Sequence, residues 1–122
     1  LTFLTHLVPM TRGILTSCYA PLTEDFIQSG QDLNNRIRDI YQNFYQKELF
    51  TRIADNPPMT KQTLGNNNCL VYPTLDRNNN RLIVISCIDN LVKGAAGQAV
   101  QNMNLMCGFN EDQGLKQLAL YP

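Results

Sequence analysis

Apolar and polar residues follow two different spacings along this chain, and the spacings predict strands in some segments and helices in others. Residues 1–8 and 14–20 are short apolar runs separated by the sequence PMTRG, a pattern typical of two strands. Residues 49–54 form another short run that stops before two prolines. Residues 69–89 contain two apolar runs on either side of an asparagine-rich turn, which predicts a hairpin.

The two arms of this hairpin are expected to occupy different places in a sheet. Pro73 has no backbone N–H to donate, so the first arm is predicted to lie at a sheet edge or to carry a bulge. Residues 82–88 are apolar on both sides of the strand except at Ser86. That pattern predicts a central strand that is covered on both faces.

A helix is predicted after residue 29. Ser29 is a candidate N-cap, and Asp32 lies three residues later in the capping-box position. Apolar residues then recur every three or four positions and are expected to form one buried stripe: Leu33, Ile37, Ile40, Tyr41 and Phe44.

A second helix is predicted after Asp89 and Asn90, which end the last strand and can cap this helix. It contains Gly94 and Gly97, although a helical glycine costs about 1 kcal/mol relative to alanine. Helical rotation places both glycines, with Gln98 and Gln101, opposite the face expected to pack on the core. That core face consists of Ala96, Ala99, Val100, Met103 and Cys107.

Two explanations for the glycine pair stay open at this level. The first turn of the helix is either loosely wound in solvent, or approached so closely by another backbone or a flat ligand that a Cβ would clash. The backbone N–H groups at a helix N-terminus also suit an anion or a polar cofactor.

Strands and then helices along the chain indicate an α+β fold, with an antiparallel or mixed sheet and helices packed on it. The length of 122 residues fits one domain. The chain starts directly in an apolar run, without a methionine or a polar lead-in, which suggests a portion of a longer protein.

Composition narrows the classes of function. Ten basic and ten acidic residues give a net charge of zero without a basic run, so neither nucleic acid nor an anionic membrane is an expected partner. No apolar stretch is long enough to span a membrane. The four cysteines lie far apart without a CxxC pair and are predicted to be reduced, mostly buried thiols in a cytoplasmic protein. A metal site is not expected, because His6 is the single histidine.

Two long segments carry a resemblance to a known family. THLVPMTRGIL at 5–15 and IDNLVKGAAGQAVQNMNLM at 88–106 closely resemble the C-terminal region of the N-acetyl-gamma-glutamyl-phosphate reductases, and GFNEDQGLKQLALYP at 108–122 is similar to their ending. The resemblance implies an NADP-dependent enzyme that makes N-acetylglutamate 5-semialdehyde in arginine biosynthesis. It also implies a Rossmann domain for NADP, absent from this chain, and a second domain like that of glyceraldehyde-3-phosphate dehydrogenase. Residues 1–122 would be the C-terminal portion of that catalytic and dimerisation domain.

The resemblance assigns binding roles but no catalytic residue to this chain. In the family a cysteine thiolate attacks the acyl phosphate and a histidine acts as acid and base, and both lie upstream of this region. Cys18 is therefore interpreted as a strand residue. Asn90 is expected to contact NADP, and Gly94 and Gly97 to let the cofactor or the Rossmann domain approach.

Two further residues are candidates for the substrate side. Arg12 is a candidate for the substrate's phosphate or carboxylate, with a structural salt bridge as the alternative. His6 is a second candidate, again with a structural role as the alternative.

The implied partners are the N-terminal Rossmann portion of the same enzyme, a small acyl-phosphate substrate and further copies of the chain in a homo-oligomer. The isolated chain is expected to be inactive. Two alternatives remain: a related reductase acting on a carrier-protein-linked acyl phosphate of lysine or arginine biosynthesis, and a non-catalytic assembly module derived from the family.

Overall fold

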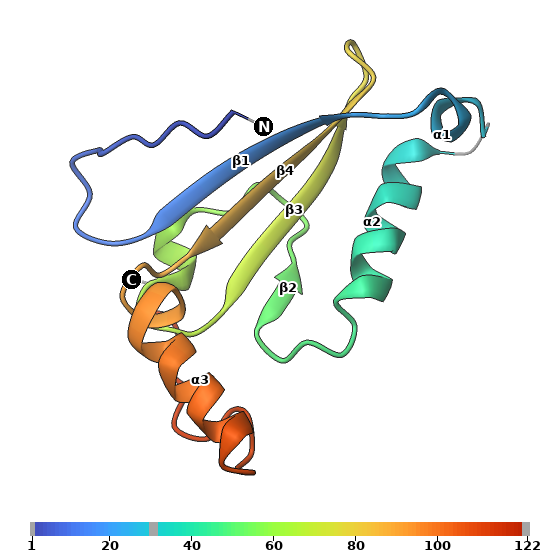
Figure 1. The fold of residues 1–122 in the computed structure, drawn as a ribbon. Coiled ribbons are helices and arrows are strands. Elements are labelled where there is room, and N and C mark those ends of the chain that lie inside the picture. The colour runs from blue at the N-terminus through green and yellow to red at the C-terminus, as the bar shows by residue number, and fades with distance from the viewer. Residues whose placement is uncertain (1, 30–31, 121–122) are drawn as a thin grey trace.

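A computed structural model describes residues 2–29 and 32–120 of the chain and shows one four-stranded mixed sheet with helices beside it (Figure 1). The strand order is β1-β4-β3-β2, which confirms the predicted α+β fold. The strands are β1 (Ile14–Pro21), β2 (Thr51–Ile53), β3 (Cys69–Asp76) and β4 (Arg81–Ile88), and the α-helices are α1 (Glu24–Gln28), α2 (Leu33–Phe44) and α3 (Gly97–Met106). A 3₁₀ turn spans Thr60–Thr63, and a π-helical turn spans Val92–Ala96 directly before α3.

The predicted hairpin is present and forms the middle of the sheet. β3 and β4 pair antiparallel, and the turn between them includes Asn80 with a left-handed φ of 46°. β1 pairs antiparallel with the other edge of β4, so β4 is central as predicted. Its residues are only half-buried apart from Cys87, so the expectation of cover on both faces is wrong.

The prediction for Pro73 is correct only for the second half of its strand: β3 lies between β4 and β2, but β2 is short. β2 runs parallel to β3 and pairs only with residues 69–71, so the second half of β3 is open on that side. Pro73 lies in this open half. Farther along the same strand, the backbone N–H of Leu75 donates to the side-chain oxygen of Asn34 on α2, 3.1 Å away.

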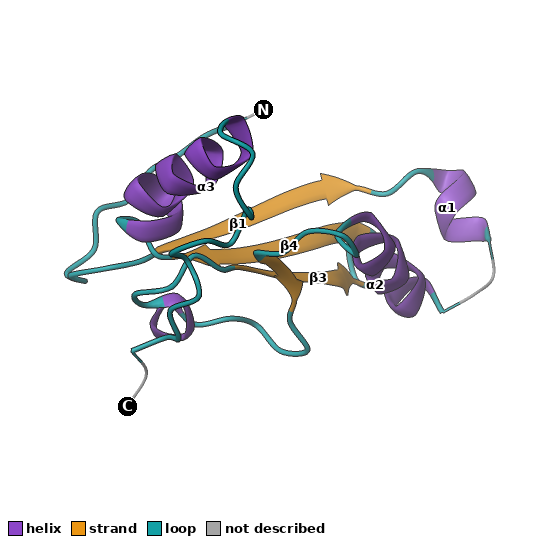
Figure 2. Cartoon of the chain, turned by 90° about the horizontal axis from the view of Figure 1, so that it is seen from below, coloured by secondary structure: helices purple, strands orange, loops and turns teal. Residues whose placement is uncertain are grey.

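The helix predicted after residue 29 is α2, but its N-cap differs from the prediction. Asp32 caps it by accepting a hydrogen bond from the backbone N–H of Asn34 at 3.1 Å, whereas Ser29 ends the short helix α1. α2 lies beside β3 (Figure 2) and also contacts β2. Ile37 is buried, while Ile40 and Phe44 are exposed, so only part of the predicted stripe is buried.

The strand predicted over residues 1–8 is absent from the described part of this segment. Residues 2–13 run irregularly alongside the sheet before β1 begins (Figure 1), and Leu1 lies outside the described residues. The apolar side chains of Phe3, Leu4 and Leu7 are largely exposed. An apolar run alone therefore did not specify a strand, since no neighbouring strand pairs with it in the described structure.

α3 presents the opposite face to the one predicted. Gly97, Gln101 and Asn104 are its buried residues, and Met103 and Cys107 of the predicted core face are exposed. Figure 1 shows α3 running away from the end of β4 rather than lying on the sheet. Within the described ranges, no helix combines the length and the apolar character that crossing a membrane requires.

Candidate functional site

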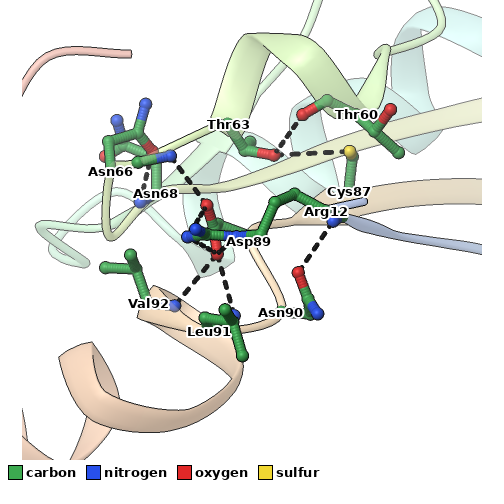
Figure 3. A network of polar contacts seen from close by, with 12 residues as sticks. Arg12, Thr60, Thr63, Asn66, Asn68, Cys87, Asp89, Asn90, Leu91 and Val92 are labelled. Carbon is green, nitrogen blue, oxygen red and sulfur yellow. Dashed lines mark hydrogen bonds and ion pairs between the residues drawn. The ribbon is translucent and has the colours of Figure 1, made fainter. Parts of the chain in front are cut away.

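Arg12 and Asn90, one from each family-like segment, lie close together where β4 ends and the turn into α3 begins (Figure 3). Asp89 lies at this junction, and its side chain is fully buried. Its Oδ1 accepts hydrogen bonds from the backbone N–H groups of Leu91 at 2.8 Å and Val92 at 3.0 Å, as expected of a cap. Its Oδ2 accepts from the backbone N–H of Gly65 at 2.7 Å.

Arg12 approaches the same carboxylate from the segment before β1. Its Nη2 lies 2.7 Å from both oxygens of Asp89, and its Nε lies 3.3 Å from Oδ1. Burial by itself raises the pKa of Asp89. The hydrogen bonds from Arg12 and from the three backbone N–H groups outweigh this effect and lower the pKa to about 2. Asp89 is therefore ionised at neutral pH, and Arg12 forms the structural salt bridge that was its alternative interpretation.

Asn90 forms the second link between the same two segments. Its Oδ1 accepts a hydrogen bond from the backbone N–H of Gly13 at 2.8 Å. Gly13 has a φ of +105°, and a Cβ there would lie 2.7 Å from the Cβ of Thr60, so this position requires glycine. No hydrogen bond is made by Nδ2 of Asn90 within the described chain, so this donor is available to a ligand.

The two glycines of the second helix differ in their surroundings. Gly94 is exposed, and a Cβ added there would make only ordinary contacts, the nearest at 3.4 Å from the carbonyl oxygen of Asp89. Gly97 is buried, and a Cβ there would overlap Oδ1 of Asn67 and approach the carbonyl oxygen of Val92 to 2.8 Å. The placement of both glycines away from the chain's own packing is therefore wrong for Gly97, which needs to be glycine for an internal contact.

A buried polar network under α3 was not predicted from the sequence. Lys93 donates to Oε1 of Gln101 at 2.8 Å, and burial lowers the pKa of this lysine. Gln101 also accepts from Asn67 at 3.0 Å and donates to Glu111 at 2.6 Å. Oδ1 of Asn67 is the one buried side-chain polar atom of the described chain that has no hydrogen-bond partner, and it lies against Gly97.

The histidine and the thiols lie apart from this junction. His6 is exposed in the irregular segment before β1 and makes no hydrogen bond in the described structure. Burial raises the pKa values of Cys69 and Cys87. Cys18 on β1 and Cys107 are exposed, so the prediction that the thiols are mostly buried is wrong. Across the described residues, no thiol is hydrogen-bonded to a histidine, and no cluster of three or more acidic, histidine or cysteine side chains could hold a metal ion.

The junction thus gathers Arg12, Asn90 and Gly94, but not His6 or the buried Gly97. It is held by Asp89, which the pattern of the sequence suggested only as a cap. The signal that could have identified its second role is the position of Arg12 and Asp89 in the two family-like segments, since an arginine fork matches a carboxylate.

Comparisons with known proteins agree with the resemblance. The family described as "Semialdehyde dehydrogenase, dimerisation domain" matches residues 1–90. A protein named N-acetyl-gamma-glutamyl-phosphate reductase from Dehalococcoides mccartyi is 54% identical over 121 residues, covering 99% of this chain and 34% of that protein. Proteins of the same name from Bacillus subtilis and Geobacter metallireducens are 48% and 49% identical over 124 residues each, again over 34% of their length. The chain therefore spans about a third of the length of the curated relatives it matches.

Proposed function

Because the chain belongs to the semialdehyde dehydrogenase dimerisation-domain family, we propose that it is one portion of an N-acetyl-gamma-glutamyl-phosphate reductase. The observation that carries this proposal is 54% identity, over 99% of the chain, to a protein of that name. The complete enzyme would reduce N-acetylglutamyl phosphate to N-acetylglutamate 5-semialdehyde for arginine biosynthesis. NADPH, when bound, would supply the reducing equivalents.

The contribution proposed for residues 1–122 is binding and positioning, as the C-terminal portion of the catalytic and dimerisation domain. Raised pKa values keep the thiols of Cys69 and Cys87 protonated at neutral pH, and a thiol is a poor nucleophile compared with a thiolate. In the family that the chain resembles, the nucleophile and the acid/base group lie upstream of this region, so both are proposed to come from another part of the enzyme. The isolated chain would then be inactive until it meets the N-terminal Rossmann portion.

The residues of the junction fit the amide end of a nicotinamide cofactor. Asn90 has an unused Nδ2 donor, and the neighbouring Gly94 is exposed with no side chain to block a flat ring. Asn90 and Gly94 are therefore the proposed NADP contacts. Gly97 is buried against Asn67, so it is not proposed as a direct cofactor contact.

The proposed substrate contacts are Arg12 and His6. Arg12 binds Asp89 through Nε and Nη2, which leaves Nη1 without a hydrogen bond in the described structure. Nη1 is therefore the atom proposed to meet a phosphate or carboxylate of the substrate. His6 is exposed and would need the complete enzyme to bring it to the substrate.

We also propose that the complete enzyme is a cytoplasmic homo-oligomer. The matched family is described as a dimerisation domain. Leu15 and Tyr19 of β1 are exposed, as are Phe3, Leu4 and Leu7 before that strand, which supports contact with a second copy.

The test is reconstitution of activity. NADPH oxidation with N-acetylglutamyl phosphate is measured for the complete enzyme, for the isolated chain, and for the chain mixed with the N-terminal portion. We expect activity in the first and third samples only. Activity restricted to a carrier-protein-linked acyl phosphate would favour the related reductase, and a complete gene product without any reductase activity would favour an assembly module.

The cofactor contact is tested by Asn90→Ala in the complete enzyme. Loss of one hydrogen bond to the cofactor is expected to raise the KM for NADPH about 2- to 10-fold. Asn102→Ala is the matched control, because Asn102 is an exposed asparagine of α3. An unchanged KM for NADPH in Asn90→Ala would remove Asn90 from the site.

A further inference from the structure

We propose that Asp89 is a positioning residue, which sets the side chain of Asn90 for its cofactor contact by fixing the segment that Asn90 binds. This inference rests on the proposed function. Its evidence is the bonding pattern of the junction and the burial of one carboxylate there.

Asp89 and Asn90, which directly follow β4, bind Arg12 and Gly13, which directly precede β1. Asp89 binds the guanidinium of Arg12 with two contacts of 2.7 Å, and Asn90 accepts from the backbone N–H of Gly13 at 2.8 Å. The position of Gly13 therefore depends on the neighbouring ion pair. The orientation of the Asn90 carboxamide depends in turn on Gly13, because that N–H is the partner of its Oδ1.

The Asp89 carboxylate is fixed from several directions at once. Besides Arg12, it accepts backbone N–H groups from Gly65, Leu91 and Val92, and its side chain is fully buried. Its backbone carbonyl also accepts from the N–H of Gly94 at 2.9 Å. Asp89 thus connects the segment before β1, the loop before β3 and the turn that carries the exposed glycine of the proposed site.

A carboxylate is needed at this position because every group that faces it is a donor. An asparagine would turn one acceptor oxygen into an NH₂ group. If the NH₂ group took the place of Oδ2, it would face two other donors, Nη2 of Arg12 and the N–H of Gly65, and neither would have an acceptor there. Placed at Oδ1, it would oppose the N–H groups of Leu91 and Val92. Either way the junction loosens, and the Gly13 to Asn90 hydrogen bond loses its support.

The experiment compares Asp89→Asn, Asn90→Ala and the double variant in the complete enzyme. Asp76→Asn is the matched control, since Asp76 also pairs with an arginine, Arg81 at 2.9 Å, at the other end of the hairpin. Amide hydrogen exchange at Gly13 is measured without cofactor, the Kd for NADPH is measured by fluorescence titration, and KM and kcat are measured by turnover. Thermal melting verifies that each variant is folded.

We expect Asp89→Asn to speed exchange at Gly13 at least about 10-fold and to raise the Kd for NADPH about 3- to 10-fold, as Asn90→Ala does. The KM for NADPH should rise by a similar factor, with a smaller change in kcat. Adding Asn90→Ala to Asp89→Asn should raise the Kd by less than about twofold more, because both changes remove the same contact. Asp76→Asn should leave all of these quantities unchanged.

Several outcomes would overturn the role of Asp89. They are an unchanged Gly13 exchange rate or NADPH affinity in folded Asp89→Asn, multiplying effects of the two variants, or an Asn90→Ala variant with normal affinity. If Asp89→Asn fails to fold, Arg12→Lys replaces it. Lysine keeps the positive charge but cannot bind the carboxylate with a planar guanidinium. Arg12→Lys should therefore speed Gly13 exchange and raise the Kd for NADPH in the same direction as Asp89→Asn, but by smaller factors. Values equal to those of the parent enzyme would overturn the proposal.

The proposed function can fail separately. An enzyme that binds NADPH with the expected variant pattern but does not reduce N-acetylglutamyl phosphate would refute the proposed reaction and support Asp89 as a positioning residue. An enzyme with full reductase activity, in which Asp89→Asn changes neither Gly13 exchange nor NADPH affinity, would support the proposed reaction and refute the positioning role of Asp89. A complete enzyme that binds no NADPH would overturn both.

Discussion

The two long helices of this chain place opposite kinds of residue toward the rest of the molecule. α2 buries Ile37, an apolar residue of its predicted stripe, and lies beside β3 and β2. α3 buries Gly97, Gln101 and Asn104 and leaves Met103 exposed. One helix therefore obeys the usual rule of an apolar inner face, and the other reverses it.

The buried faces of α2 and α3 differ because the groups that each helix contacts are different, and polarity alone does not decide which face of a helix is buried. Asn104 of α3 donates from its side chain to the backbone carbonyl oxygens of Glu111 at 3.0 Å and Gln113 at 2.9 Å. Gln101 joins Asn67, Lys93 and Glu111. Buried polar side chains are tolerated when they are hydrogen-bonded, and Gln101 and Asn104 both are. Their partners in the segment after α3 and in the loop before β3 make the polar face of α3 its inner face.

The largest expected difference in unfolding free energy is between two variants that each remove one apolar side chain, one on α2 and one on α3. Ile37→Ala removes a side chain that is 3% exposed and should lower the free energy of unfolding of the chain by about 3 kcal/mol. Met103→Ala removes a side chain that is 49% exposed and should change it by less than about 0.5 kcal/mol. Urea unfolding of both variants checks the contrast, and similar losses would show that the apolar face of α3 is an inner face after all.

The second contrast uses the two glycines around the start of α3. Gly97→Ala places a Cβ against Oδ1 of Asn67 and 2.8 Å from the backbone carbonyl of Val92, so we expect a loss of about 2 to 3 kcal/mol. Gly94→Ala makes only ordinary contacts and should stay within about 1 kcal/mol of the parent protein. Equal melting temperatures for the two variants would contradict the tight packing of Gly97.

The elements that the sequence predicts correctly are those fixed by neighbouring residues. β1, the β3–β4 hairpin and α2 are found because turn residues and local periodicity specify them. The irregular 2–13 segment and the inner face of α3 are missed, since both depend on residues distant in the chain. A helical projection contains no information about a carbonyl at residue 111 or an amide at residue 67.

In the candidate site, too, some features can be predicted from nearby residues and others depend on residues far away in the chain. Asn90 and Arg12 are singled out from the family-like segments, and their roles in binding stay predictions. The structure brings the two segments together through Gly13 and Asp89. The buried position of Asp89 and its pairing with Arg12, 77 residues away, result from the meeting of two strands and not from spacing. Nothing in the local pattern could assign that pairing.

A third contrast sharpens the role of polar residues on α3. Asn104→Leu leaves two backbone carbonyl oxygens without their donor at a site that is 1% exposed, and should lower the free energy of unfolding by about 2 kcal/mol. Asn102→Leu, on the exposed side of the same helix, should change it by less than about 0.5 kcal/mol. A stabilised Asn104→Leu variant would mean that the polar face of α3 is not held by these bonds.

The smallest expected effect concerns the aspartates that cap the two helical regions. Asp32 caps α2 at an exposed site, and Asn is an equally good N-cap, so Asp32→Asn should alter stability by less than about 0.5 kcal/mol. Asp89 caps the turn into α3 while buried, with its pKa lowered from the ordinary 3.8 to about 2. The gap between these values corresponds to about 2 kcal/mol of stability, which is fully present above pH 3.8 and is lost as the pH falls through 2.

Comparison of the parent protein with Asp89→Asn isolates this contribution from the other carboxylates, because the variant cannot titrate at that position. The stability difference between parent and variant should therefore be constant from pH 7 to 5 and shrink by about 1.5 kcal/mol by pH 2.5. Urea unfolding at several pH values measures it. A difference that stays constant down to pH 2.5 would mean that the buried carboxylate does not stabilise the start of α3 through its charge.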